Sequence, residues 1–593
     1  MYQELKRVRR SLWFLLGAAC TVLVLFLVLV VLLAAFFAPP ELKVEPGTVM
    51  AIRLGGMLGE APATGFLEQL SGTVGNSLWD VRRALERAKD DDRIAAVKLD
   101  IGILETGWGA VAEVASCLEA FRSSGKPVYA YAASEFIGEK EYAAALGADK
   151  VWLAPGTGIF IDGLRAEVVF WRGTLDKLKI VPDLLAFKEY KSAGEPFART
   201  KMSEYFRASL TDLLTDIQDQ FIEWVANQRS MDRETVLEQI NKGLLTADRA
   251  RSGGWVDAVG YSDELEKELQ ALAGIEQYKE ISHGDYLLRV EQKTGYRHKL
   301  GVVFAEGPII SSEVDELPFQ TRIISGPRIA AAIDSAVKDK GVKAIILRVN
   351  SGGGSAIGSD YIWRAIDRAH EAGKPVVATM SDVAGSGGYW IAVGADKIVA
   401  QASTITGSIG VVMLKLNLRG FYELIGATVD DITLANNADM LSLFENLSEE
   451  QRALLTLWME DVYEQFKQKV VSGRGLSLDD VERVAKGRIW TGKQALDHGL
   501  IDSLGGIKEA IAEAKKLANI PESDDVSFEI YPKPRTWFGK LFARGIPVTL
   551  PRYAVSGGLA REFAGNLTRL PEPLWWDLST PQPLALVPSI RTR

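Results

Sequence analysis

The chain has 593 residues, more than one ordinary domain holds, so we expect at least two large domains. Its apolar content of 47% and charged content of 24% are typical of a globular protein. A net charge of −9 argues against a nucleic-acid partner, and the four histidines are not paired at metal-ligand spacing, so we predict no metal site.

The first predicted element is a membrane anchor. Residues 12–38 are apolar apart from Thr21 and one glycine, and about 20 such residues suffice to cross the hydrocarbon core. The run is longer than the roughly 7–15 residues of a cleaved signal peptide core, so we expect it to be retained. Basic residues in the 1–11 segment predict a cytoplasmic N-terminus, which puts the rest of this single-pass chain across the bilayer.

An internal repeat follows. Gly125-Lys126-Pro127-Val128 recurs 248 positions later as Gly373-Lys374-Pro375-Val376. Gly147-Ala148-Asp149-Lys150 recurs 247 positions later as Gly394-Ala395-Asp396-Lys397. A nearly constant offset of this size indicates two copies of one structural unit.

The repeat predicts a domain organisation. We place the first copy at residues 45–290 and the second at residues 298–532, with the boundary in the polar stretch between them. Residues 533–593 are richer in proline and form a predicted C-terminal tail, whose role the sequence leaves open.

Strand and helix patterns alternate within each copy. In the second copy, Val342–Val349 is a predicted strand, Tyr361–Glu371 a predicted helix, and Pro375–Met380 another predicted strand. Such alternation predicts an α/β fold around a mostly parallel sheet. Ligand sites in these folds gather at the carboxyl ends of the strands.

One serine lies at such an end. Ser386 stands between glycines after a predicted strand and at the start of a predicted helix, where free N–H groups favour negative charge. A second glycine turn, Gly352–Gly354, follows the Val342–Val349 strand and could supply N–H donors to an oxyanion. Two tight turns with a capping serine are the alternative interpretation.

The repeat favours a functional site. The first copy has Glu139 opposite Ser386, and it has Gly102-Ile103-Leu104-Glu105 opposite the glycine turn that begins at Asn350. A purely structural turn should survive in both copies. The paired loss therefore suggests a site that only the second copy keeps.

A serine nucleophile needs a base. None of the histidines (His283, His298, His370 and His498) lies in a recognisable triad context, and lysine is the known alternative. Such a lysine must lose its proton, although its ordinary pKa is about 10.4, so it should lie in an apolar cleft. Chemistry alone does not select one lysine from this sequence.

The chain also resembles the long, two-copy form of the signal peptide peptidase A family, also called protease IV. The resemblance covers roughly residues 45–530. It rests on four motifs: Arg348–Ser355, Ser386–Trp390, Thr406–Gly410 and Tyr190–Phe197.

The resemblance implies a role for specific residues. Ser386 would be the nucleophile, Lys191 the general base and Ser408 the residue that orients the lysine. The oxyanion donors would come from Gly353, Gly354 and Gly387. This chain has Gly352 where the family usually has proline, and glycine makes the turn more flexible than proline would.

The resemblance further implies two tandem crotonase-like (ClpP-type) domains in a homotetramer that uses no cofactor. The expected substrates are hydrophobic peptides, namely remnant signal peptides that signal peptidase has released. The expected location is the bilayer of a bacterial inner membrane, with the catalytic body on the periplasmic side. Two alternatives stay open: an acyl-CoA enzyme of the same fold and an inactive scaffold that binds membrane peptides.

Overall fold

The computed structural model describes residue 21 and residues 44–62, 77–290, 295–313, 323–533 and 584–586. The predicted anchor, apart from Thr21, and most of the predicted tail lie outside these ranges. Among the helices in the described ranges, none is long and apolar enough to cross a membrane.

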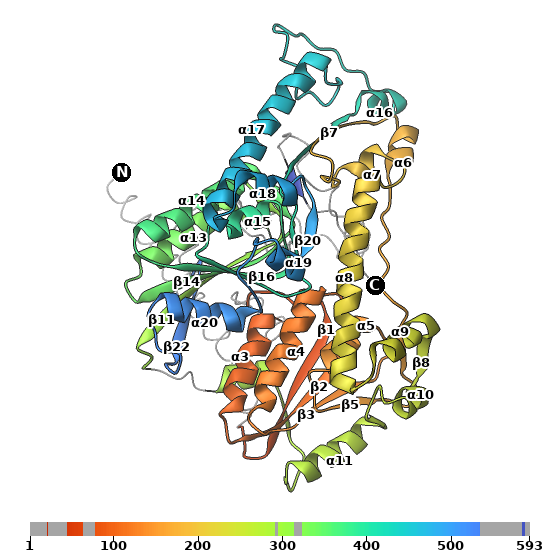
Figure 1. The fold of residues 1–593 in the computed structure, drawn as a ribbon, viewed down its shortest axis with the longest axis vertical. Coiled ribbons are helices and arrows are strands. Elements are labelled where there is room, and N and C mark those ends of the chain that lie inside the picture. The colour runs from red at the N-terminus through yellow and green to blue at the C-terminus, as the bar shows by residue number, and fades with distance from the viewer. Residues whose placement is uncertain are drawn as a thin grey trace, which may run out of the picture.

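The first copy is built on a parallel six-stranded sheet (Figure 1). Its order is β10-β1-β2-β3-β5-β9, and every neighbouring pair is parallel. The central strand β3 is buried along its whole length, as expected where helices cover both faces of a sheet. The strands are β1 (Thr48–Gly56), β2 (Ile94–Leu104), β3 (Val128–Ala132), β5 (Lys150–Leu153), β9 (Ala258–Val259) and β10 (Glu280–Ser282).

Helices pack against this sheet and form two apolar clusters with it, a large one and a smaller one that includes Tyr129, Trp152 and Leu269. The helices of the first copy are α3 (Leu78–Lys89), α4 (Trp108–Arg122), α5 (Glu139–Ala145), α6 (Arg172–Lys177), α7 (Glu195–Ala198), α8 (Glu204–Arg229), α9 (Arg233–Lys242), α10 (Ala247–Ser252), α11 (Ser262–Leu272) and α12 (His283–Arg289). Helix α8 begins where the Ser203 hydroxyl accepts a hydrogen bond from the Phe206 N–H, and it runs alongside both copies (Figure 1).

The second copy repeats this architecture. Its path β22-β11-β14-β16-β17-β21 matches the first sheet strand for strand, and β18 and β20 extend the sheet from the end of β16. The α/β class and the duplication predicted from sequence are therefore confirmed. The strands are β11 (His298–Glu306), β14 (Val342–Ser351), β16 (Val376–Gly385), β17 (Lys397–Ala400), β18 (Ile405–Gly407), β20 (Ile489–Thr491), β21 (Ser503–Leu504) and β22 (Val526–Tyr531).

Two predicted elements of the second copy are longer than expected. The helix expected at Tyr361 begins at Ala356, because the Ser355 hydroxyl accepts from the Gly358 N–H and caps it. The strand expected to end at Met380 continues to Gly385, where β18 pairs with it. The helices here are α13 (Gly326–Lys338), α14 (Ala356–Glu371), α15 (Gly387–Ala392), α16 (Arg419–Leu424), α17 (Glu449–Arg474), α18 (Leu478–Val484), α19 (Gly492–Asp497) and α20 (Ile507–Leu517).

A further sheet joins the two copies. Strand β7 of the first copy pairs antiparallel with β19 of the second, from Val181 opposite Asn417 to Phe187 opposite Val411. Leu185 of β7 packs in the apolar core of the second copy, so the two copies share buried surface. The order is β13-β12-β15-β23-β19-β7, and β23 is the described part of the tail. These strands are β7 (Val181–Phe187), β12 (Ile309–Ile310), β13 (Ile324–Ser325), β15 (Gly353–Ser355), β19 (Val411–Asn417) and β23 (Leu584–Leu586).

A small sheet completes the first copy. Its order is β4-β6-β8. Strand β4 pairs parallel with β6 and β6 pairs antiparallel with β8, which is the pattern that the end of β16 makes with β18 and β20 in the second copy. Its strands are β4 (Phe136–Ile137), β6 (Gly158–Ile161) and β8 (Gly243–Thr246).

Candidate active site

Ser386 lies in the tight turn between strand β16 and helix α15. Its backbone has φ +55° and ψ −116°, a conformation that costs a non-glycine residue about 1–3 kcal/mol. The Ser386 N–H donates to the Gly407 carbonyl at 2.8 Å, which ties the turn to β18. A Cβ on Gly388 would lie only 2.4 Å from the Ser351 carbonyl oxygen, so glycine is required there. The turn thus fixes the buried hydroxyl at the start of a helix.

Lys191 reaches this serine from the other copy. It follows strand β7, its side chain is buried, and its Nζ lies 2.7 Å from Ser386 Oγ. The same nitrogen donates to the Ser408 carbonyl at 2.9 Å and to Ser408 Oγ at 3.0 Å. A neutral amine has two N–H groups and one lone pair. With both N–H groups on Ser408, its lone pair is directed to the Ser386 hydroxyl.

The environment of Lys191 favours that neutral form. Burial lowers the pKa of the Lys191 ammonium well below its usual value of 10.5. The structure therefore brings together the three side chains predicted from sequence, Ser386, Lys191 and Ser408, in an arrangement suited to proton transfer.

Two glycines of the second copy leave the space that Lys191 occupies. A Cβ on Gly487 would lie 2.5 Å from the Lys191 backbone nitrogen, and one on Gly410 would lie 3.2 Å from Lys191 Cδ. The Tyr190 N–H donates to the Lys486 carbonyl at 3.1 Å. This contact was not predicted from the sequence, although a Lys-Gly dipeptide occurs in both copies, as Lys242-Gly243 and Lys486-Gly487, and marks the position.

The three predicted oxyanion glycines also lie together. Gly353 and Gly354 have φ of +105° and +152°, and a Cβ on Gly354 would lie 2.1 Å from the Ile309 carbonyl oxygen. A Cβ on Gly387 would lie 3.1 Å from Gly354 N, so strand β15 and the turn at Ser386 are in contact. Gly387 starts α15, where N–H groups have no partner within the helix. The Gly353 N–H donates to Ser351 Oγ at 3.1 Å.

The corresponding position of the first copy has different chemistry. Glu139 begins helix α5, and its carboxylate accepts from the N–H groups of Asp162 at 3.0 Å and Gly163 at 2.9 Å. Burial raises the pKa of Glu139 to about 7. A carboxyl group that satisfies two backbone donors has thus replaced the hydroxyl at this position.

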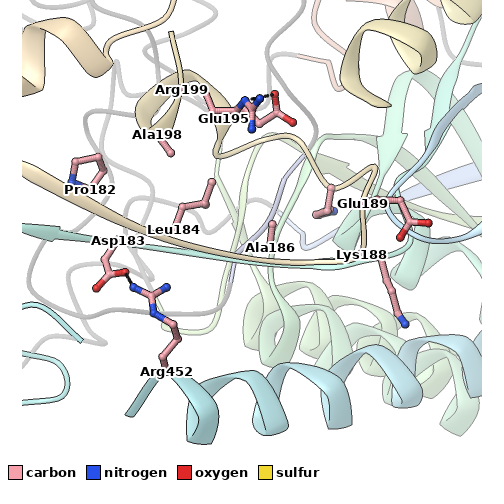
Figure 2. Close-up of a pocket in the computed structure, with 11 residues that line it drawn as sticks. Pro182, Asp183, Leu184, Ala186, Lys188, Glu189, Glu195, Ala198, Arg199 and Arg452 are labelled. Atoms are coloured by element: carbon pink, nitrogen blue, oxygen red, sulfur yellow. Dashed lines mark hydrogen bonds and ion pairs between the residues drawn. The ribbon is translucent and has the colours of Figure 1, made fainter. Parts of the chain in front are cut away.

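A cavity of about 650 Å³ opens beside Lys191. Its residues come from β7, α7 and the start of α17, and the ion pairs Asp183–Arg452 and Glu195–Arg199 lie on its wall (Figure 2). Apolar side chains lie between these charged groups. The lining residues are Pro182, Asp183, Leu184, Ala186, Lys188, Glu189, Lys191, Glu195, Ala198, Arg199 and Arg452.

Comparison with known proteins gives consistent matches. The model of peptidase family S49 matches residues 120–276 and residues 368–521, one segment in each copy. Serine protease SPPA, chloroplastic, of Arabidopsis thaliana is 34% identical over 516 residues, which cover 86% of this chain and 75% of the plant protein. Protease 4 of Salmonella typhi is 34% identical over 460 residues, covering 75% of this chain and 73% of that protein.

A shorter relative matches one part of the chain. The putative signal peptide peptidase SppA of Enterococcus faecium is 34% identical over 194 residues, covering 32% of this chain and 56% of that protein. The first family segment contains Lys191, and the second contains Ser386 and Ser408.

Proposed function

The chain belongs to peptidase family S49 and is a serine-type peptidase, and we propose that Ser386 and Lys191 form its catalytic dyad. The observation that carries the proposal is the 2.7 Å separation of Lys191 Nζ and Ser386 Oγ in a buried setting. Family membership also favours peptide hydrolysis over acyl-CoA chemistry or an inactive scaffold.

The proposed reaction is acyl transfer through the serine. As Ser386 Oγ bonds to the carbonyl carbon of the scissile peptide, its proton passes to Lys191 Nζ. The lysine then returns a proton to the leaving amine as the C–N bond breaks, which leaves an ester on Ser386. Water, deprotonated by the now neutral Lys191, cleaves that ester and restores the serine hydroxyl. Ser408 keeps the amine directed at Ser386 throughout.

Backbone amides would stabilise the tetrahedral oxyanion. The Gly387 N–H at the start of α15 is one donor, and the Gly353–Gly354 turn beside it supplies the second. The Gly353 N–H would exchange its bond to Ser351 Oγ for one to the oxyanion. Each such donor contributes about 2.7–4 kcal/mol to acyl transfer.

We propose remnant signal peptides as the substrates. The cavity beside Lys191 has apolar wall segments at Leu184, Ala186 and Ala198 that suit the side chains of an apolar peptide. Extended peptides commonly bind as an added strand. In this structure β23 lies between β15 and β19 and pairs with both, so a substrate that binds there as a strand would take the place of β23. The name of the Enterococcus faecium relative agrees with this substrate class.

The proposed setting is a membrane surface. The apolar run 12–38 and the basic segment before it support a single anchor in a bacterial inner membrane, with the N-terminus in the cytoplasm and the body in the periplasm. We propose a homotetramer on the basis of the family resemblance alone.

A peptide-cleavage assay tests this function. The full chain in detergent is incubated with a synthetic signal-peptide fragment and, separately, with a charged peptide of equal length, and products are identified by mass spectrometry. We expect cleavage of the apolar peptide by the wild type and none by Ser386→Ala or Lys191→Ala. Wild-type turnover in either variant would refute the dyad, and equal cleavage of both peptides would refute the substrate class.

A further inference from the structure

A buried cluster of charges lies where the two copies meet. Arg348, in the middle of β14, has a 2% exposed side chain, and its Nε donates to Glu60 Oε2 at 2.7 Å. Its Nη2 lies 2.8 Å from Glu113 Oε2. Both carboxylates belong to the first copy, whereas Arg348 belongs to the second. Removing one member of such a buried pair leaves an uncompensated charge, so the cluster fixes the contact between the copies.

The carboxylate of Glu60 also reaches the end of the same strand. Asn350 lies two residues after Arg348, and its Nδ2 donates to Glu60 Oε1 at 2.9 Å. Asn350 Oδ1 accepts from the Val383 N–H at 3.2 Å. Strand β14 then enters the Ser351–Gly354 glycine turn, and Val383 lies three residues before Ser386. One carboxylate of the first copy thus connects, through Asn350, to both the glycine turn and the nucleophile strand.

A second connection holds the nucleophile strand. The Asp382 carboxylate accepts from the N–H groups of Gly107 at 2.9 Å and Ala110 at 2.8 Å, at the start of helix α4. A Cβ on Gly109 would lie 2.5 Å from the Ser381 carbonyl oxygen, so helix and strand are in close backbone contact. Because Glu113 lies on the same helix and contacts Arg348, α4 touches both strands that carry the site.

Within the described residues, the hydrogen bonds and ion pairs of Arg348, Glu60 and Asn350 go to one another and to neighbouring residues rather than to Ser386 or Lys191, so their effect on the reaction is indirect. We propose that Glu60, through Arg348 and Asn350, positions the oxyanion turn relative to Ser386. This inference rests on the proposed function, because it assigns the first copy a second contribution to the same reaction beside Lys191. Its consequence is that the interface between the copies sets the geometry on which the oxyanion depends.

Two variants test the inference in the full chain. Glu60→Gln removes the charge that pairs with Arg348, and Asn350→Ala removes the link to Val383 while leaving the Arg348–Glu60 pair in place. For each, kcat and KM for an apolar peptide are measured well below the unfolding temperature. We expect kcat to fall about 10–100-fold, since a displaced donor forfeits much of its effect, while KM changes less than about threefold.

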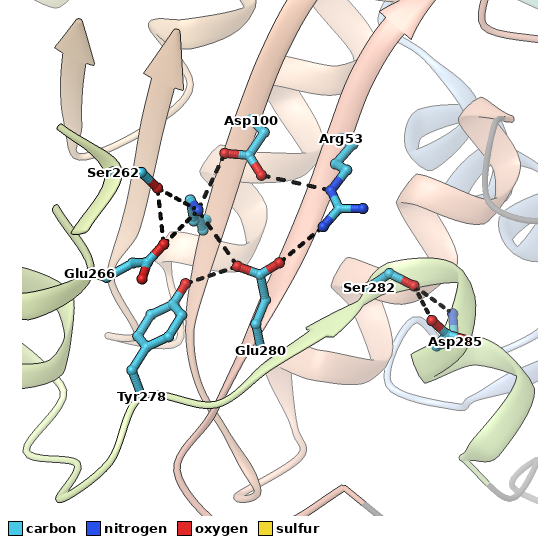
Figure 3. Close-up of polar contacts among 9 residues, drawn as sticks. Arg53, Asp100, Ser262, Glu266, Tyr278, Glu280, Ser282 and Asp285 are labelled. Atoms are coloured by element: carbon cyan, nitrogen blue, oxygen red, sulfur yellow. Dashed lines mark hydrogen bonds and ion pairs between the residues drawn. The ribbon is translucent and has the colours of Figure 1, made fainter. Parts of the chain in front are cut away.

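A charge network within the first copy supplies the control. Glu280 lies 3.3 Å from Arg53 Nη2 and 3.6 Å from Lys98 Nζ, and it accepts from the Tyr278 hydroxyl at 3.0 Å (Figure 3). These partners are all in the first copy, so Glu280→Gln should lower the melting temperature without lowering kcat. If Glu60→Gln and Asn350→Ala both fold and keep the wild-type kcat, the cluster only stabilises the protein and the inference is wrong.

Failure of the inference is distinguishable from failure of the proposed function. The rate at which a small fluorophosphonate labels Ser386 is measured in the same proteins. If the wild type is neither labelled nor active, the proposed function is wrong. If Ser386 is labelled in the wild type and labelling is equally fast in Glu60→Gln and Asn350→Ala, only the positioning role is refuted.

Discussion

Lys191 Nζ lies 2.7 Å from Ser386 Oγ, although 195 positions separate the two residues in the chain. The lysine follows strand β7 of the first copy, and the serine follows strand β16 of the second. Since β7 pairs along its length with β19 of the second copy, the pairing of these two strands brings Lys191 to Ser386. Neither copy holds both residues.

Replacement of the lysine by an apolar side chain should stabilise the fold. Burial lowers the pKa of Lys191, so between that pKa and 10.5 the unfolded chain binds a proton that the folded chain does not. Wild-type stability therefore increases with pH in that range. We expect Lys191→Met to raise the melting temperature at pH 7 and to lose part of this advantage at pH 9.5. An advantage that grows with pH would contradict the assigned pKa shift.

Crowding at Gly487 should impair the base without touching the nucleophile. The Cβ of Gly487→Ala would meet Lys191 N at 2.5 Å and Lys191 Cα at 2.6 Å. We expect kcat for an apolar peptide to fall at least about tenfold, because a misplaced base loses its contribution to proton transfer.

Gly475→Ala is the matched control. Gly475 also has a positive φ, +64° against +84° for Gly487, but a Cβ there meets nothing within 4 Å. Both variants therefore carry backbone strain, and only one displaces Lys191. If Gly475→Ala lowers kcat as much as Gly487→Ala does, backbone strain alone explains the effect.

The strained backbone at Ser386 should lower the stability of the folded protein. Glycine adopts the observed φ of +55° without the steric penalty of a Cβ, whereas alanine does not. Ser386→Gly and Ser386→Ala both lack the hydroxyl, so both should be inactive. We expect the glycine variant to be more stable than the alanine variant by about 1 kcal/mol. Thermal unfolding of the two proteins side by side measures the difference, and a more stable alanine variant would argue against strain.

Substrate selection should respond to the cavity beside Lys191. Ala186 lines that cavity, and Ala186→Trp would place a bulky side chain in it. We expect KM for an apolar peptide to rise about tenfold, since a buried side chain contributes roughly 1.5–3 kcal/mol to binding. Labelling of Ser386 by a small fluorophosphonate, which does not need the cavity, should stay near the wild-type rate. An unchanged KM would exclude the cavity as a binding subsite.

Much of the fold could be predicted from local patterns in the sequence. The repeat that links Gly125 to Gly373 predicted two copies, and the structure has two sheets of the same order. The serine between glycines predicted a turn from strand to helix, which is the observed setting of Ser386. These features depend on neighbouring residues, so they are visible in one sequence.

The contacts between the two copies could not be predicted from local sequence patterns. Lys191 was selected through family resemblance alone. Its burial depends on Gly410 and Gly487 of the other copy, and a single sequence does not show that these residues lie beside it. The Arg348–Glu60 pair joins residues 288 positions apart, and a single sequence does not reveal which charges meet. The predicted anchor at 12–38, the tetramer and the domain limits stay predictions.

The labelling rate of Ser386 as a function of pH tests the central claim most directly. The full chain and the Lys191→Met variant are treated with a fluorophosphonate, and the modified serine is identified by mass spectrometry. We predict that wild-type labelling is confined to Ser386 and rises with pH to a plateau well below pH 10.5, as Lys191 loses its proton. The variant should be labelled at least about 100-fold more slowly. Equal labelling of the two proteins at every pH would contradict a Ser386–Lys191 dyad.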